Sequence, residues 1–433
     1  MLSEIEIGNK IIRIPTYFPK VKSKLDLSVL LSYTHLLDYQ LQGVCFNIKD
    51  VEKLLSHFET RSYQTDLFSL KPINNEESAI KTLLENGLFM IDPQIETLYY
   101  DKKIDENRSY KSEILKTLNF SRDIKSILMS SKSSNHNQIW KDLIRYKYLL
   151  PVINQYLLYQ NKFNPDIIIP PTPVIDGRSL KIVDIAYLIN KFSIGMVRDR
   201  MDALPATYLP IHYNAIKKKD FLDIVFNRFR ELFMISRIAI IKLMWYDYLI
   251  NDDIAIFSKF LSRIDELKND LGDEFLVIYL DGGNEGFYTL GNGVDIYVEP
   301  MDGIVRYKMK KGKDIDEVEV DKMLNIIETN KHGRYYLKDN RKYISFSELM
   351  DIVKNNKGML PCSCSACKEL HQKLSYEIPA EKWNIHRRLH LINARLEEIE
   401  EKLKSWIIDN IVDEMRLYAL SENNKNHVYL LPK

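Results

Sequence analysis

Short, almost continuously apolar runs recur along this chain, with stretches of helical periodicity between them. Such runs are typical of parallel strands that helices cover on both faces. The segments 221–229 and 254–267 carry apolar residues at helical spacing. We expect strands at 43–48, 88–91, 166–169, 193–197, 207–211, 238–243, 275–280 and 294–298. Strands that alternate with helices predict βα units and a parallel sheet.

About eight strands of this kind favour an α/β fold, a (β/α)8 TIM-type barrel whose functional residues lie at the strand C-termini. A doubly wound open sheet is the alternative. We expect the barrel at 1–310, with a helical insertion around 100–160. A zinc-binding subdomain with a C-terminal helix is expected at 311–433. Within these regions, 301–360 is charged and irregular in pattern, and 378–420 has helical spacing.

The composition predicts a globular protein, because 45% of the residues are hydrophobic and 28% are charged. No apolar run reaches membrane-spanning length and the N-terminus does not resemble a signal peptide, so we expect a cytoplasmic protein with no membrane partner. The formal net charge of +1 gives no global field for nucleic acid. Any phosphate-binding surface must therefore be local, and the basic run 308–313 is a candidate.

Three of the four cysteines fall within six positions, at Cys362, Cys364 and Cys367. Thiolates at this spacing can converge on Zn²⁺, and a histidine can complete the tetrahedron. The helical segment 383–392 offers His386 and His390. We expect a structural zinc site, since four protein ligands leave no open position for water. A loop of free thiols is the alternative, and a disulfide framework is not expected.

The cysteine motif and the barrel pattern together resemble the tRNA-guanine transglycosylase superfamily. That family includes queuine and archaeosine tRNA enzymes and relatives that insert 7-deazaguanines into DNA. Its fold is a (β/α)8 barrel with a C-terminal Cys-x-Cys-x-x-Cys…His zinc site. The segments 14–19 and 291–297 resemble its Thr-Pro-x-Phe-x-Pro and Gly-Val-Asp-x-Phe motifs, and 281–283 matches its glycine-rich loop after strand seven. Counting along the family's apolar helix favours His390 over His386 as the fourth ligand.

The resemblance implies a pentosyltransferase that exchanges guanine for a 7-deazaguanine through a carboxylate nucleophile and a covalent glycosyl-enzyme. Asp92 matches the aspartate of the family's Asp-Ser-Gly-Gly loop, but the Ser-Gly-Gly is missing and Pro93 follows. Val298 stands at the family's nucleophile position. The nearby carboxylates Asp295 and Glu299 are therefore the remaining catalytic candidates.

The implied partners are nucleic acid, either tRNA or DNA, a 7-deazaguanine base, and other subunits in a homo- or hetero-oligomer. The candidate base- or nucleic-acid-binding residues are His212, at the end of an expected strand, and Lys310, Lys311 and Arg387 near the cysteines.

Each candidate also has a structural interpretation. Asp92 can cap a turn, Asp295 can be a buried structural partner, Glu299 can face solvent, and His212 can be a satisfied loop histidine.

Three functional hypotheses follow. The first is an active base-exchanging transglycosylase. The second, which Val298 and the lost Ser-Gly-Gly motivate, is a catalytically degenerate relative that serves as a nucleic-acid-binding or partner subunit. The third is an unrelated zinc-stabilised barrel that acts on a small molecule.

Overall fold

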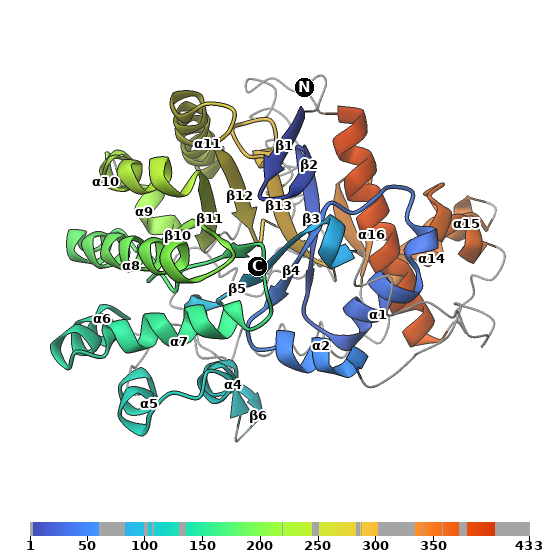
Figure 1. Cartoon of the computed structure of the whole chain (residues 1–433). Coiled ribbons are helices and arrows are strands. Elements are labelled where there is room, and N and C mark those ends of the chain that lie inside the picture. The colour runs from blue at the N-terminus through green and yellow to red at the C-terminus, as the bar shows by residue number, and fades with distance from the viewer. Residues whose placement is uncertain are drawn as a thin grey trace.

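The computed structural model is an α/β barrel with helices around it and a smaller C-terminal region on one side (Figure 1). The residues that the structure describes are 3–59, 83–98, 103–105, 108–129, 136–218, 220–244, 251–282, 286, 288–301, 334–339, 341–356, 358–371 and 379–402.

The barrel is a parallel sheet in the order β10-β11-β12-β13-β3-β4-β5-β8-β9. Its strands are β3 (Thr16–Val21), β4 (Gly43–Asn47), β5 (Leu88–Asp92), β8 (Ile167–Ile168), β9 (Leu204–Pro205), β10 (Thr207–His212), β11 (Ile238–Met244), β12 (Leu276–Leu280) and β13 (Ile296–Pro300). Ala206 joins β9 directly to β10, and its amide donates to the Ile168 carbonyl. The two ends of the sheet therefore meet, and the predicted barrel is confirmed.

Seven of the eight expected strands are present, and one prediction is wrong. Segment 193–197 lies inside helix α8 (Leu180–Arg200), where its β-branched residues belong to a long helical pattern. Two strands of the sheet lie outside the expected set: β3, which pairs with β13 and β4, and the short β9, which pairs with β8. Pro19 and Lys20 interrupt the apolar pattern of β3, and this is why periodicity alone did not identify it.

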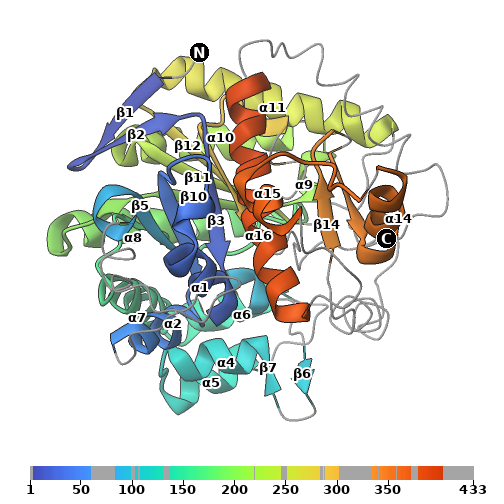
Figure 2. The same ribbon diagram turned by 90° about the vertical axis from the view of Figure 1, so that its right-hand side faces the viewer.

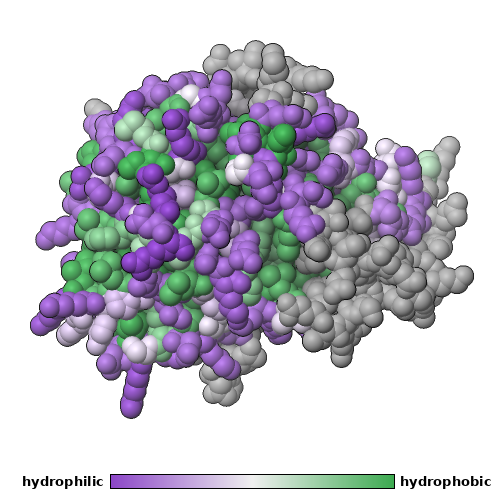
Figure 3. All heavy atoms as spheres, viewed as in Figure 1, coloured by the Kyte–Doolittle hydropathy of each residue, from purple (hydrophilic) through white to green (hydrophobic). Residues whose placement is uncertain are grey.

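The remaining helices cover the barrel and form the expected insertion. Helices α1 (Lys24–Ser32), α2 (Val51–Glu59), α8, α10 (Phe221–Ser236) and α11 (Asn251–Leu271) follow successive strands. Between β5 and β8, the described residues include α4 (Tyr110–Thr117), α5 (Arg122–Met129), α6 (His136–Arg145) and α7 (Leu149–Asn161). Of the helices in the described ranges, none combines the length and apolarity needed to cross a membrane. Hydrophilic side chains are spread between apolar ones over the face in Figure 3.

The C-terminal region packs against the barrel through one long helix, α16 (Ala380–Lys402). In Figure 2 this helix runs beside β3 and α1, which it also contacts. It further contacts β14 (Arg334–Leu337), which forms a hairpin with β15 (Lys342–Ser345). The expectation of irregular structure at 301–360 is wrong for 334–355, because the hairpin continues into α14 (Phe346–Asn355) through a capping box at Ser345.

Candidate functional site

Three cysteines and one histidine gather in the C-terminal region at a spacing that one metal ion can bridge. The ligand atoms of Cys362, Cys364, Cys367 and His390 all lie within 4.8 Å of one another. The Nδ1 atom of His390 lies 3.6 Å from the Cys364 sulfur and 3.4 Å from the Cys367 sulfur. This set of soft sulfur atoms and one imidazole nitrogen fits the preferences of Zn²⁺.

The second nitrogen of His390 fixes the orientation of its ring. Its Nε2 lies 2.6 Å from the backbone carbonyl of Tyr336, so it donates there and leaves Nδ1 for the sulfurs. Metal-binding histidines usually have such a partner. His386 is also close, with Nε2 3.7 Å from the Cys367 sulfur, and burial lowers its pKa to about 3. The cluster of four ligand atoms nevertheless includes His390 and not His386.

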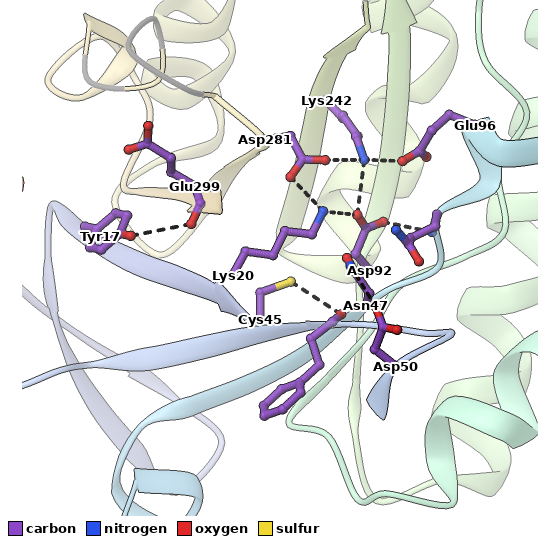
Figure 4. A network of polar contacts seen from close by, with 12 residues as sticks. Tyr17, Lys20, Cys45, Asn47, Asp50, Asp92, Glu96, Lys242, Asp281 and Glu299 are labelled. Atoms are coloured by element: carbon purple, nitrogen blue, oxygen red, sulfur yellow. Dashed lines mark hydrogen bonds and ion pairs between the residues drawn. The ribbon is translucent and has the colours of Figure 1, made fainter. Parts of the chain in front are cut away.

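Four buried charged residues form a closed ring at the C-terminal ends of the barrel strands, which we call the charge ring: Lys20, Asp92, Lys242 and Asp281. Lys20 contacts Asp92 and lies 2.6 Å from Asp281 Oδ1. Lys242 closes the ring, at 3.1 Å from Asp92 Oδ2 and 2.6 Å from Asp281 Oδ2. Charges of opposite sign alternate around the ring (Figure 4). Each side chain is at most 7% exposed, so the ring is shielded from solvent.

A third carboxyl group joins the charge ring from outside. Glu96 lies on the short 3-10 helix Ile95–Leu98 after β5, and its Oε1 accepts from Lys242 at 2.5 Å. One oxygen each from Glu96, Asp92 and Asp281 lie within 4.8 Å of one another. The two lysine ammonium groups already contact these oxygens, so the carboxyl groups pair with lysines in this arrangement.

The charge ring separates the pKa values of its carboxyl groups. Burial acts to raise the pKa of Asp92 and Asp281, but attraction to Lys20 and Lys242 outweighs it and holds both pKa values below their ordinary range. Burial also raises the pKa of Glu96, and here Lys242 does not overcome it. Asp92 and Asp281 are thus held as carboxylates, while Glu96 is the carboxyl group most ready to hold a proton.

Two of the three catalytic candidates from the sequence lie away from the charge ring. Asp295 precedes β13 and so belongs to the opposite, N-terminal rim of the barrel. Its Oδ2 accepts from Lys268 and from the amide of Val277, both at 2.8 Å. Asp295 therefore joins α11 to the base of the sheet, and its expected position at the site is wrong.

Glu299 lies on β13 but faces outward. Its carboxylate accepts from Arg395 of α16, at 2.9 Å, and from the Tyr343 hydroxyl, at 2.7 Å. Figure 4 shows this side chain pointing away from the charge ring. Successive side chains on a strand alternate between its faces, so Val298 faces the barrel interior. The prediction that Glu299 lines the site is therefore wrong, and Glu299 instead connects the barrel to α16.

The binding candidates are also not gathered at one place. His212 ends β10 on the expected rim, where its Nδ1 accepts from the Asn214 amide at 3.0 Å and caps α9 (Tyr213–Ile216). Arg387 is buried and donates to the Asn384 side chain at 2.7 Å, so its proposed exposure to phosphate is wrong. Lys310 and Lys311 lie outside the described residues.

The sequence indicated Asp92 as a site residue but did not assign Lys20, Glu96, Lys242 or Asp281 to the site. The signal for the lysines is present in the strands. Lys242 interrupts the apolar run of β11, and Lys20 lies in β3, whose residues are all buried. A charge in a buried strand must be paired, and such a residue at a strand C-terminus indicates a functional site.

No family model and no curated protein matches this chain.

Proposed function

We propose that this chain exchanges a base in nucleic acid by double displacement, replacing guanine with a 7-deazaguanine in tRNA or DNA. Asp92 and Asp281 are its working carboxylates. The observation that carries the proposal is that an oxygen of each lies within 4.8 Å of the other at the C-terminal end of the barrel. Retaining glycosidases, which form a covalent glycosyl-carboxylate, place their two carboxyl groups about 5–5.5 Å apart.

Asp281 is the better nucleophile of the two. Each of its oxygens accepts from one lysine, whereas Oδ2 of Asp92 faces both lysines and Oδ1 accepts from the Gln94 amide. Asp281 also has a φ of +55°, which few residues other than glycine adopt and which is often found at active sites. In this proposal Asp281 attacks the ribose anomeric carbon, and Asp92 holds the two lysines in place.

Asp281 also lies beside the position where the resemblance expects the nucleophile. Leu280 pairs with Val298 across β12 and β13, and the amide of Gly282 donates to the Val298 carbonyl at 3.2 Å. Asp281 stands between these two contacts. Val298 provides no carboxylate at the expected position. In this proposal Asp281, which follows the neighbouring strand β12, provides it instead.

The metal in this proposal is a structural Zn²⁺ held by Cys362, Cys364, Cys367 and His390. It fixes α16 and the loop before α15 (Ser365–His371), and takes no part in the reaction. Nucleic acid, the incoming base and a second subunit are the proposed partners.

A second candidate function follows from the same ring. All four oxygens of Asp92 and Asp281 already accept hydrogen bonds or ion pairs. If a substrate does not displace the lysines from the two aspartates, neither carboxylate can attack. The chain is then a catalytically degenerate subunit that binds nucleic acid for an active partner.

The test is incorporation of radiolabelled guanine into mixed tRNA and DNA by the purified chain. We expect incorporation by the natural protein, none by Asp281→Asn, and no change in Glu231→Gln, a control whose carboxylate is 56% exposed on α10. Denaturing mass spectrometry should detect a nucleic-acid adduct on the peptide that contains Asp281. Binding of nucleic acid without incorporation would reject the first function and support the second.

A further inference from the structure

The two oxygens of Glu96 have different surroundings. Oε1 accepts from Lys242 at 2.5 Å, while Oε2 is buried and has no hydrogen-bond partner among the described residues. The hydroxyl groups of Tyr156 and Tyr208 are likewise buried without a partner in this part of the structure. Burial raises the pKa of both tyrosines, and both lie close enough to Glu96 for its charge to act in the same direction. A buried polar atom without a partner is costly, so this side of the charge ring is suited to receive a polar group from a ligand.

Helix α4 packs against the 3-10 helix that carries Glu96 and contains the buried Lys111. The other charged and titratable groups near Glu96 come from six elements. They are Lys20 of β3, Asp92 of β5, Tyr156 of α7, Tyr208 of β10, Lys242 of β11 and Asp281 after β12. Within the charge ring two ammonium groups balance two carboxylates. A proton on Glu96 therefore leaves the whole cluster neutral, whereas its ionised form adds an uncompensated buried charge.

We propose that Glu96 is the proton donor to the departing base, a role that rests on the base exchange proposed above. As Asp281 forms its bond to the anomeric carbon, the glycosidic bond breaks and its electron pair goes to the leaving nitrogen. Glu96 protonates the leaving base and becomes a carboxylate. In the second step the incoming base attacks the anomeric carbon, the bond to Asp281 breaks, and Glu96 takes up the proton that the incoming base loses.

Asp281, the proposed nucleophile, and Glu96, the proposed acid, have different surroundings. Lysines contact both oxygens of Asp281, which keeps it ionised. Glu96 contacts a single lysine, and its other oxygen has no hydrogen-bond partner among the described residues. Burial raises the pKa of Glu96, which favours the protonated form that a general acid needs near neutral pH.

The experiment compares two leaving groups in Glu96→Gln. Guanine exchange requires a proton on the leaving base, whereas p-nitrophenyl ribofuranoside releases a phenolate that needs none. We expect exchange to fall about 10²–10⁴-fold, as loss of a general acid usually does. The first-turnover burst of p-nitrophenolate, which precedes the proton transfer of the second step, should change less than about twofold. The decrease of the wild-type exchange rate at alkaline pH should also disappear. Glu96→Asp should retain that decrease and recover part of the exchange rate.

The outcomes distinguish the two proposals. Equal loss on both substrates in Glu96→Gln and Glu96→Asp, or no loss on either, would overturn the role of Glu96. A natural protein that processes neither substrate would instead reject the proposed function. Asp281→Asn should lose both reactions, and Glu231→Gln should keep both.

Discussion

Replacing Lys242 with methionine tests whether the charge ring balances its own charges. The Lys242 ammonium lies 2.5, 2.6 and 3.1 Å from Glu96, Asp281 and Asp92, and the side chain is 1% exposed. Methionine keeps most of the buried aliphatic stem and removes only the charge. Removing one partner of a buried ion pair costs about 3–5 kcal/mol, because the remaining charge is left uncompensated. We expect Lys242→Met to lose about this much. Lys20 still pairs with both aspartates and keeps the loss from being larger.

The pH dependence of this loss gives a sharper test than its size. Burial already raises the folded pKa of Glu96 in the natural protein. With one lysine left for Asp92 and Asp281, the folded pKa of at least one of these two must also rise above its unfolded value of about 4. The folded variant then binds more protons than the unfolded chain between these two pKa values, so its stability increases as pH falls toward 4. The natural protein should show the opposite contribution from Asp92 and Asp281, whose lowered pKa values stabilise it above about pH 4.

Urea unfolding of both proteins at pH 7.5 and pH 5 measures these effects. The deficit of Lys242→Met should be smaller at pH 5 than at pH 7.5. Lys162→Met is the matched control, because its ion pair with Glu52 is about half exposed and contributes less than about 1 kcal/mol. A loss below 1 kcal/mol in Lys242→Met, or a deficit that is equal at both pH values, would refute the charge balance argued here.

Further variants test the remaining parts of the structure. Atomic absorption should find about one zinc per chain in the purified protein. Cys364→Ser should lose the metal and several kcal/mol of stability. The control variant Cys45→Ser should keep the metal. Arg395→Met should lower the melting temperature through a loss of about 3–5 kcal/mol, because Glu299 is then buried without its charged partner. Retention of zinc by the first variant, or an unchanged melting temperature in the last, would contradict the corresponding assignment.

Much of the barrel could be predicted from the sequence, because buried parallel strands need nearly continuous apolar runs. The predictions for segment 193–197 and for β3 failed because a short run does not show the structure of the residues that flank it or the strands that pair with it. Segment 193–197 has the composition of a strand, but it continues the helical pattern of α8 on both sides. Strand β3 contains Pro19 and Lys20, and its strand character comes from pairing with β13 and β4. The helical pattern on both sides therefore decided segment 193–197, whereas tertiary pairing decided β3 against its local pattern.

The cysteine cluster could be predicted because its three thiols are close in sequence, while the charge ring could not, because its members come from four separate strands or strand ends. Asp295 and Glu299 lie next to the expected nucleophile in sequence, but one belongs to the opposite rim and the other to the outer face of β13. Spacing along a chain gives neither the end of a strand nor the face of a side chain unless the register is known.

The position of Asp281 gives a direct test of the proposal that its carboxylate serves in place of the nucleophile expected at 298. Val298 faces the barrel interior and pairs with Leu280. Asp281 follows Leu280 with a positive φ, and its carboxylate contacts Lys20 and Lys242 inside the barrel, so we expect a carboxylate at 298 to approach the same two lysines. We expect Asp281→Ala to abolish guanine exchange and the double variant Asp281→Ala, Val298→Asp to recover a measurable part of it. The double variant Asp281→Ala, Val298→Asn is the control, because the asparagine side chain has nearly the shape of aspartate but carries no charge. Equal exchange in the two double variants, measured by guanine incorporation, would show that the reaction does not pass through a carboxylate at this point of the barrel.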